Sequence, residues 1–375
     1  MGIFSSEDFA LPARMLRQGV EEGVFPGAAL VIGNRTGELF RCLEGYRALH
    51  PAPLPLREDT KFDIASLTKL LSTTMIALRL LEQGELSLNT PVSAYWDCPA
   101  DKSAITLKHL LTHTSGLHPS YHLEKEAASP SEAVFSILHS PLVDPVGTRV
   151  HYSCMGFILL GRTLEQITGQ RLDILFQQLV ARPLGLCSTG YLPICPGRDP
   201  GDNFAATEYR PELGRHLCGV VHDENARFLG GVSGNAGLFS TADDLSRFGR
   251  MLANRGELDG NCFLSPATFD MAVKNYTSFD PCEFRGIGFS LTDSRLYRSG
   301  TILSAGDLFA DGSYGHTGYT GASLWVDCSS GLYVALLTNR VHPSRQNVRL
   351  MPFRRRLHNA IQAAYSRKAG RIQWG

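Results

Sequence analysis

Hydrophobic residues recur at two different spacings along the first fifty positions of the chain. Apolar positions at helical spacing predict a helix over residues 9–22, which the stretch "GVFPG" then ends. The apolar run "AALVIGN" (28–34) predicts a buried strand, and "ELFRCLEGYRA" (38–48) predicts its hairpin partner. The turn "NRTG" between the two supplies Gly37 for a positive φ.

Helical patterns dominate the middle of the sequence. Residues 64–84 carry apolar side chains three and four apart, which predicts a helix with Ser66 near its start. Further helices are expected in "TLKHLLTH", "PSEAVFSILHS", "CMGFILLGRTLEQITG" and "TADDLSRFGRMLANRG", separated by glycine and proline. After about residue 285 the strand pattern returns in "ASLWVDCSSGLYVALLTN", and "MPFRRRLHNAIQAAYSRK" closes the chain as a helix.

Strands near both ends of the chain, with helices between them, predict that the two ends share one sheet. The expected fold class is α/β plus all-α. Residues 1–62 and 285–375 are expected to form an antiparallel sheet flanked by helices, and residues 63–284 a mainly helical domain. We expect the functional site between these two parts.

Composition narrows the class of partner. Thirty-six basic and 36 acidic residues cancel, so neither a nucleic acid nor a membrane surface is favoured over a small-molecule substrate. Nine cysteines without a C-x-x-C pair argue against a zinc site and a disulfide framework. The first residues lack a secretory pattern and no apolar run reaches membrane-spanning length. These features predict a cytoplasmic protein, although a chain trimmed of a leader would look the same.

Ser66 and Lys69 carry the first candidate chemistry. A helix places residues three apart on one face, so the hydroxyl and the amine can lie side by side. Serine is a weak nucleophile until a base takes its proton, and a lysine buried among leucines would disfavour its charged form. The other interpretation of this pair is an exposed lysine beside a capping serine.

Two later stretches complete a pattern. Tyr152 lies in "VHYSCMGFILLG", and His316, Thr317 and Gly318 lie in "YGHTGYTGAS". Ser-x-x-Lys, tyrosine and His-Thr-Gly in this order resemble the serine β-lactamase and penicillin-binding-protein superfamily, nearest the class C β-lactamases and family VIII esterases. The phrases "LLTHTSGL", "GLFSTADDLSRF", "VHDENA" and "LLTNRVHPSRQN" extend the resemblance over about residues 20–350. It implies a β-lactamase/transpeptidase-like fold.

The resemblance also implies roles for the matching residues. Ser66 would be the acylated nucleophile, and Lys69 and Tyr152 would share the work of general base and general acid. The backbone N–H groups of Ser66 and Tyr319 would form the oxyanion hole.

The His-Thr-Gly stretch would bind substrate. His316, if protonated, would hold a substrate carboxylate and, with Lys69, would supply positive charge to the phenol of Tyr152. Thr317 would line the substrate site, and Gly318 would let the substrate approach the backbone closely.

Two departures from the class C pattern affect the expected substrate. Cys154 stands where those enzymes have asparagine, and His316 stands where they have lysine. A thiol is a weak hydrogen-bond partner, so Cys154 orients a substrate amide less well than asparagine would. An ester needs less help with its leaving group than an amide does. We therefore expect a serine hydrolase that cleaves small esters through a covalent acyl-enzyme.

Several alternatives stay open. β-Lactamase and D-alanyl-D-alanine carboxypeptidase or transpeptidase activity are the alternatives within the enzyme class, and a catalytically silent acyl- or peptide-binding protein is the alternative outside it. His109 and His113 lie four apart, but no H-E-x-x-H motif accompanies them, so we expect no metal and no organic cofactor. Arg345 is a candidate contact for a substrate carboxylate, with a solvated surface arginine as the other interpretation. The turn "GNAG" (234–237) lacks the spacing of a nucleotide-binding loop. The sequence leaves the oligomeric state open.

Overall fold

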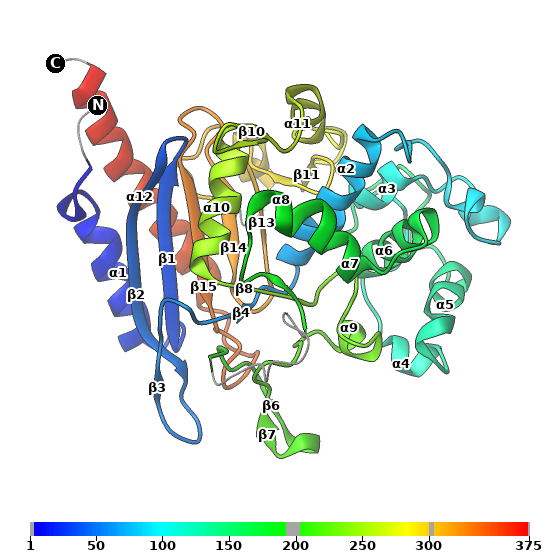
Figure 1. Cartoon of the computed structure of the whole chain (residues 1–375), viewed down its shortest axis with the longest axis horizontal. Coiled ribbons are helices and arrows are strands. Elements are labelled where there is room, and N and C mark those ends of the chain that lie inside the picture. The colour runs from blue at the N-terminus through cyan, green and yellow to red at the C-terminus, as the bar shows by residue number, and fades with distance from the viewer. Residues whose placement is uncertain (1–3, 193–202, 300–303, 374–375) are drawn as a thin grey trace.

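The computed structural model describes residues 4–192, 203–299 and 304–373. Its main sheet has eight antiparallel strands in the order β11-β12-β13-β14-β15-β1-β2-β3. Strand β1 pairs with β2 on one side and with β15 on the other, so the two ends of the chain meet in one sheet (Figure 1). The strands are β1 (Gly27–Asn34), β2 (Gly37–Ala48), β3 (Leu54–Pro55), β11 (Phe284–Arg285), β12 (Ser290–Leu291), β13 (Tyr314–Thr317), β14 (Ser323–Val326) and β15 (Tyr333–Thr338).

Helices cover both faces of this sheet (Figure 1). Helices α1 (Ala10–Glu21) and α12 (Leu350–Gln373) pack together on one face, and α10 (Ala242–Ala253) packs against β1, β14 and β15 on the other. Strand β1 alternates between the two apolar clusters, since Leu30 belongs to the α1–α12 side and Val31 to the opposite side. Both faces of β1 are therefore buried, which is why its sequence reads as one continuous apolar run.

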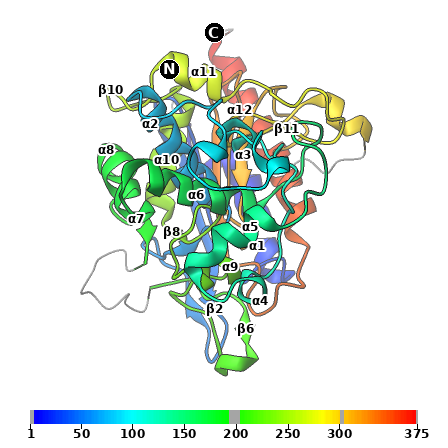
Figure 2. The same cartoon turned by 90° about the vertical axis from the view of Figure 1, so that its right-hand side faces the viewer.

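The remaining helices lie mostly to the right of α10 in Figure 1 and toward the viewer in Figure 2. They are α2 (Met75–Glu82), α3 (Leu107–Leu111), α4 (Leu123–Glu126), α5 (Ala133–His139), α6 (Cys154–Thr168), α7 (Leu172–Phe176), α8 (Arg182–Leu184), α9 (Glu224–Phe228) and α11 (Pro266–Ala272). Short strands make three small sheets: β4 (Phe62–Asp63), β8 (Leu238–Ser240) and β5 (Gly190–Tyr191); β6 (Tyr209–Arg210) and β7 (Arg215–His216); β9 (Glu257–Leu258) and β10 (Asn261–Cys262).

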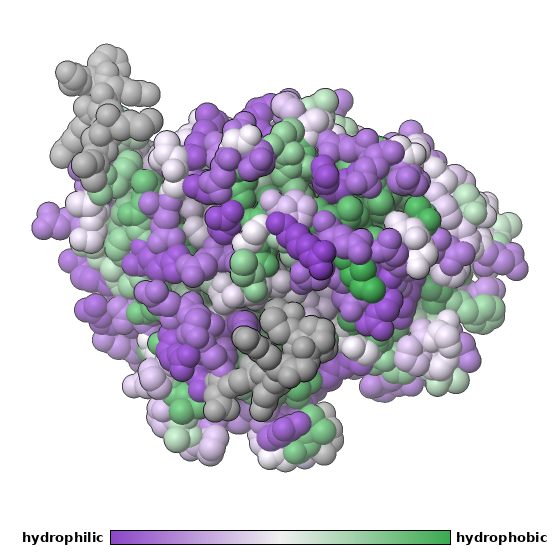
Figure 3. All heavy atoms as spheres, in the orientation of Figure 1, coloured by the Kyte–Doolittle hydropathy of each residue, from purple (hydrophilic) through white to green (hydrophobic). Residues whose placement is uncertain are grey.

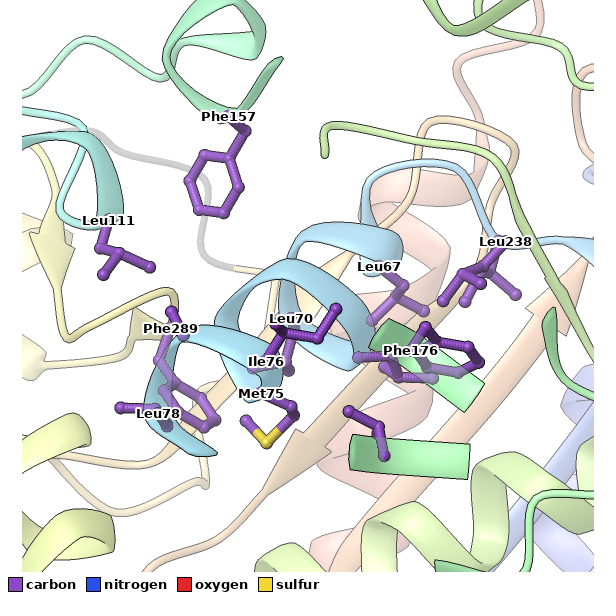
Figure 4. Close-up of a cluster of buried hydrophobic side chains, with 14 of the residues drawn as sticks. Leu67, Leu70, Met75, Ile76, Leu78, Leu111, Phe157, Phe176, Leu238 and Phe289 are labelled. Atoms are coloured by element: carbon purple, nitrogen blue, oxygen red, sulfur yellow. The ribbon is translucent and has the colours of Figure 1, made fainter. Parts of the chain in front are cut away.

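The largest apolar cluster surrounds the helical segment that follows Ser66. Leu67 and Leu70, both fully buried, pack in this cluster with Phe157 of α6 and Phe176 of α7 (Figure 4). A side chain on this segment is therefore held by neighbours from several elements.

The predicted fold class is confirmed: an antiparallel sheet flanked by helices, joined to a helical region. The division into domains at residues 63 and 284 stays a prediction. Helix α10, from the middle of the chain, packs on the sheet. No helix in the described part of the chain is long and apolar enough to cross a membrane. Hydrophilic and hydrophobic residues are mixed over the face seen in Figure 3.

Candidate active site

Ser66 follows a sharp turn that a buried carboxylate holds in place. Ala65 has a φ of +45°, in the left-handed region that strains a residue with a side chain. Its N–H donates to Oδ1 of Asp63 over 2.8 Å, and Oδ2 of Asp63 accepts the N–H of His222 over 2.7 Å. Burial raises the pKa of Asp63 to about 6. The turn thus places Ser66 just before the helix, where its hydroxyl can face Lys69.

The ammonium of Lys69 is fully buried and makes three contacts. It donates to Oγ of Ser66 over 2.9 Å and to the carbonyl of Asn235 over 2.9 Å, and it lies 3.5 Å from the thiol sulfur of Cys154. Lys69 opens a π-helical turn (Lys69–Thr74), a wide turn that often occurs at functional sites. The predicted pairing of Ser66 with Lys69 on one face is present.

The turn at 234–237 supplies the acceptor for Lys69. Thr73 donates its hydroxyl to the carbonyl of Gly234 over 2.7 Å, and the N–H of Leu238 donates to the hydroxyl of Thr68 over 3.1 Å. The sequence revealed only a turn here. A backbone carbonyl has no residue-type signature, so its role as a partner of Lys69 was not predictable.

Tyr152 lies beside Lys69 at the start of α6. The amine of Lys69 is 5.0 Å from the centroid of the Tyr152 ring, and Ser153 caps the helix by accepting the N–H of Gly156. Burial raises the pKa of Tyr152, although the charge of Lys69 opposes this. The pKa of Lys69 is also raised: burial lowers it, but negative charge on Cys154 and Tyr152 outweighs that effect. The sequence predicts a lowered pKa for Lys69, and this prediction is wrong. Because the pKa of each group is raised, Tyr152 is a phenol and Lys69 an ammonium near neutral pH.

His316 lies in β13, 5.9 Å from Tyr152 between ring centroids, and is buried. Its Nδ1 faces the carbonyl of Thr317 at 2.8 Å and must donate to it. Within the described residues its Nε2 has no hydrogen-bond partner. Burial and the charges of Arg285 and Lys69 hold the pKa of His316 well below its usual range. His316 is therefore neutral near pH 7, and the prediction that a protonated His316 holds a substrate carboxylate is wrong.

Besides Lys69, the cation beside Tyr152 is Arg285 and not His316. This residue of β11 is only 4% exposed, and its guanidinium carbon lies 5.2 Å from the centroid of the Tyr152 ring. It donates to the hydroxyl of Ser290 over 2.7 Å and pairs with Glu283. No motif marks Arg285, because only the pairing of the edge strands brings it to Tyr152.

The expected oxyanion donors are available. In the described part of the chain, neither the N–H of Ser66 nor that of Tyr319 has an acceptor. The hydroxyl of Thr320 donates to the carbonyl of Asp63 over 2.6 Å. A Cβ on Gly318 would lie 2.3 Å from the carbonyl oxygen of Ile64. The close approach at Gly318 is thus to the chain itself, and it brings Tyr319 next to the Ser66 turn.

Arg345 already has partners. Its Nε donates to both carboxylate oxygens of Glu208, at 2.8 and 2.7 Å, and its Nη2 donates to Glu224 over 2.6 Å. Glu208 also contacts Nε2 of His222, whose ring stacks on Tyr319. Arg345 therefore supports one wall of the site and is not free to meet a substrate carboxylate.

The histidines outside the His-Thr-Gly stretch have structural contacts. His109 accepts the N–H of Thr106 at the start of α3, and His113 accepts the N–H of Ser153. No group of three metal-ligating side chains occurs among residues 4–192, 203–299 and 304–373. The cysteines of these segments are all free.

Comparisons with known proteins agree with this geometry. The family model described as Beta-lactamase matches residues 12–357. N-acetylmuramyl-L-alanine amidase of Bacillus subtilis (strain 168) is 32% identical over 90% of this chain and 82% of its own. An Escherichia coli O157:H7 protein provisionally named D-alanyl-D-alanine carboxypeptidase is 28% identical over 88% of this chain and 81% of its own.

Solved structures show the same fold. A penicillin-binding-protein homologue from Caulobacter crescentus has a TM-score of 0.75 at 19% identity, with 97% of this chain and 99% of that chain covered. EstCE1, a hydrolase with promiscuous acyltransferase activity, has a TM-score of 0.73 at 23% identity, with 95% and 99% covered. The fold is that of β-lactamases and transpeptidases, as the motifs implied. The chain belongs to the beta-lactamase family of serine hydrolases.

Proposed function

We propose that this protein hydrolyses esters through an acyl-enzyme on Ser66. The main support is the hydrogen bond of 2.9 Å from the buried amine of Lys69 to Oγ of Ser66. The centroid of the Tyr152 ring lies 5.0 Å from the same amine. A nucleophile, its base and a neighbouring cation are the parts that acyl transfer needs.

The protonation states of Tyr152 and Lys69 indicate the order of the catalytic steps. Tyr152 and Lys69 both hold protons at rest, because the pKa of each is raised. Loss of one proton from this coupled pair generates the base, and the charges of Lys69 and Arg285 favour the phenolate form. The base takes the proton of Ser66 as Oγ attacks the carbonyl carbon, and the N–H groups of Ser66 and Tyr319 stabilise the oxyanion. The proton then passes to the leaving alcohol, and water repeats the sequence on the acyl-enzyme.

The environment of Lys69 favours esters over amides. Cys154 is in contact with the amine of Lys69 and offers only a weak hydrogen bond. His316 is neutral and its Nδ1 is engaged by Thr317, so it is a poor proton donor to an amide nitrogen. An alkoxide or phenoxide leaves with less protonation than an amine requires.

A peptide ending in D-alanine is the second candidate substrate. It is supported by the Escherichia coli O157:H7 relative, whose provisional name is D-alanyl-D-alanine carboxypeptidase.

One panel separates these activities. Purified protein is assayed on p-nitrophenyl acetate and butyrate, on nitrocefin and on a D-Ala-D-Ala peptide. We expect the highest kcat/KM on the esters, and a loss of at least about 1,000-fold in Ser66→Ala. The exposed Ser131→Ala variant serves as a control and should keep full activity. Peptide or β-lactam turnover above ester turnover would contradict the proposed specificity, and an active Ser66→Ala would contradict the mechanism.

A further inference from the structure

A cavity at the far end of the sheet lies outside the site around Ser66. The chain after β2 and the β6–β7 hairpin project from the same end of the molecule in both views (Figures 1 and 2). Between them is a cavity of about 1,100 Å³, and none of its lining residues belongs to the site described above. Its size suits an organic ligand.

The lining of this cavity is cationic and apolar. It includes Arg47, Arg215 and His216, and none of the described lining residues has a carboxylate side chain. Leu54 and Tyr209, respectively 37% and 44% exposed, contribute apolar surface. In a chain whose charges cancel, this is an uneven distribution of charge.

Arg47 is the most informative of these residues. It is only 9% exposed, and the one hydrogen bond of its side chain to the described residues is from Nη1 to the carbonyl of Phe204, over 3.3 Å. Neither Arg47 nor Arg215 has an ion-pair partner in that part of the chain. Buried charges in proteins are normally paired, so a buried guanidinium that faces a cavity indicates a site for an anion.

The walls of the cavity are held in place. His342 donates from Nδ1 to the carbonyl of Thr207 over 2.8 Å and accepts the N–H of Leu49 at Nε2 over 2.9 Å. Its ring packs on His216, with 4.5 Å between ring centroids, and His50 stacks on His216 at 5.4 Å. The Nδ1 atom of His216 is buried without a hydrogen-bond partner among the described residues. A polar atom and stacked rings thus lie beside the two cations.

We propose that this cavity binds an organic anion with an apolar, ring-containing body. Arg47 and Arg215 would pair with the acidic group, and Tyr209, His216 and Leu54 would contact the rings. The cavity lies behind one wall of the active site, because Tyr209 faces it while Glu208 and Arg210, on either side in sequence, contact the Arg345 and Glu224 cluster.

A matched pair of probes tests the proposal on the full chain. 8-Anilinonaphthalene-1-sulfonate carries the anion, and N-phenyl-1-naphthylamine has the same rings without it. Binding of each is followed by fluorescence titration of the wild type and of Arg215→Glu. Arg14→Glu is the control, since Arg14 is an exposed arginine on α1, away from the cavity. We expect Arg215→Glu to raise the Kd of the sulfonate at least about tenfold and to leave the Kd of the amine unchanged.

Arg47→Met is a second variant, and its thermal unfolding shows whether it folds. If this variant folds, it should raise the Kd of the sulfonate probe as Arg215→Glu does. The proposal is overturned if the wild type does not bind the sulfonate, if the amine binds as tightly, or if Arg215→Glu binds the sulfonate as the wild type does. The last result would place the probe elsewhere, including at Ser66.

Discussion

The charges around Tyr152 decide when the site can react. Both the pKa of Tyr152 and that of Lys69 are raised, so the pair releases its proton on the alkaline side of neutrality. We therefore expect kcat/KM for esters to rise steadily above about pH 7, with no plateau below the ordinary pKa of tyrosine of about 10. The neutral His316 adds no step of its own near pH 6.5.

Arg285 should tune this profile through Tyr152 without touching substrate esters. Arg285→Met removes a positive charge 5.2 Å from the ring, so the alkaline limb should move up by about one pH unit and the rate at pH 7 should fall about tenfold. Arg285→Lys should keep most of the wild-type profile. The exposed Arg295→Met is the control. An unshifted profile in Arg285→Met would show that the residue serves only to hold β11.

Cys154 should limit the range of substrates. Replacing it by asparagine gives Lys69 a stronger hydrogen-bond partner and gives a substrate amide an orienting group. Cys154→Asn should therefore raise the ratio of nitrocefin turnover to p-nitrophenyl ester turnover, measured side by side. Cys328→Asn, an exposed cysteine, is the control. An unchanged ratio means that the thiol does not set the preference.

The turn that holds Lys69 depends on close contact between two glycines. A Cβ on Gly234 would lie 2.0 Å from the carbonyl oxygen of Phe157 in α6, and Gly161 faces it from the same helix. Gly234→Ala must therefore move the turn and stretch the bond between Asn235 and Lys69. We expect a loss of about 1–3 kcal/mol in the free energy of unfolding and a lower kcat in the protein that remains folded. Thermal unfolding and active-site-normalised kinetics measure the two effects, and wild-type values in both would refute this role.

The helices and strands were largely predictable from the sequence, but the contacts between side chains from distant elements were not. The continuous apolar run of β1, which is buried on both faces, and the helical spacing of apolar residues after Ser66 identified these two elements. The same reasoning missed Arg285 and Asp63. Arg285 reaches Tyr152 through strand pairing, and Asp63 acts by accepting backbone N–H groups, so neither has a local sequence signal.

The errors at His316 and Lys69 share one cause. A protonated His316 was considered from its place in the motif, and a disfavoured charge on Lys69 from its apolar neighbours, whereas the pKa of each side chain also depends on groups from distant parts of the chain. Burial and the charges of Arg285 and Lys69 keep His316 neutral, and interactions with Cys154 and Tyr152 raise the pKa of Lys69 against the effect of burial.

Across the chain as a whole, buried histidines should make folding sensitive to acid. Burial lowers the pKa of His222 and His342 to about 4 and that of His358 to about 3. Unfolding lets each bind a proton at its ordinary pKa near 6.5, so the stability they hold above that pH is lost as pH falls from 6.5 toward 4. The raised pKa of Asp63 acts in the opposite direction and only partly compensates.

At about pH 5 each of the three histidines should lower the free energy of unfolding by on the order of 1–2 kcal/mol. We therefore expect a Tm at least about 5 °C below that at pH 7. His358→Asn retains a donor for the carbonyl of Ala305 and should show a shallower dependence. Scanning calorimetry at both pH values measures it. A Tm that is level from pH 7 to pH 5 would contradict this assignment.

Covalent labelling of the nucleophile is the most direct test of whether Ser66 forms the acyl-enzyme. The full chain is treated with a fluorophosphonate probe, its intact mass is measured, and the labelled peptide is sequenced. We expect one adduct per chain, located on Ser66 and absent from Ser66→Ala, with ester hydrolysis falling in proportion to labelling. Ester hydrolysis that persists with Ser66 unlabelled, or a label on another residue that alone abolishes activity, would contradict it.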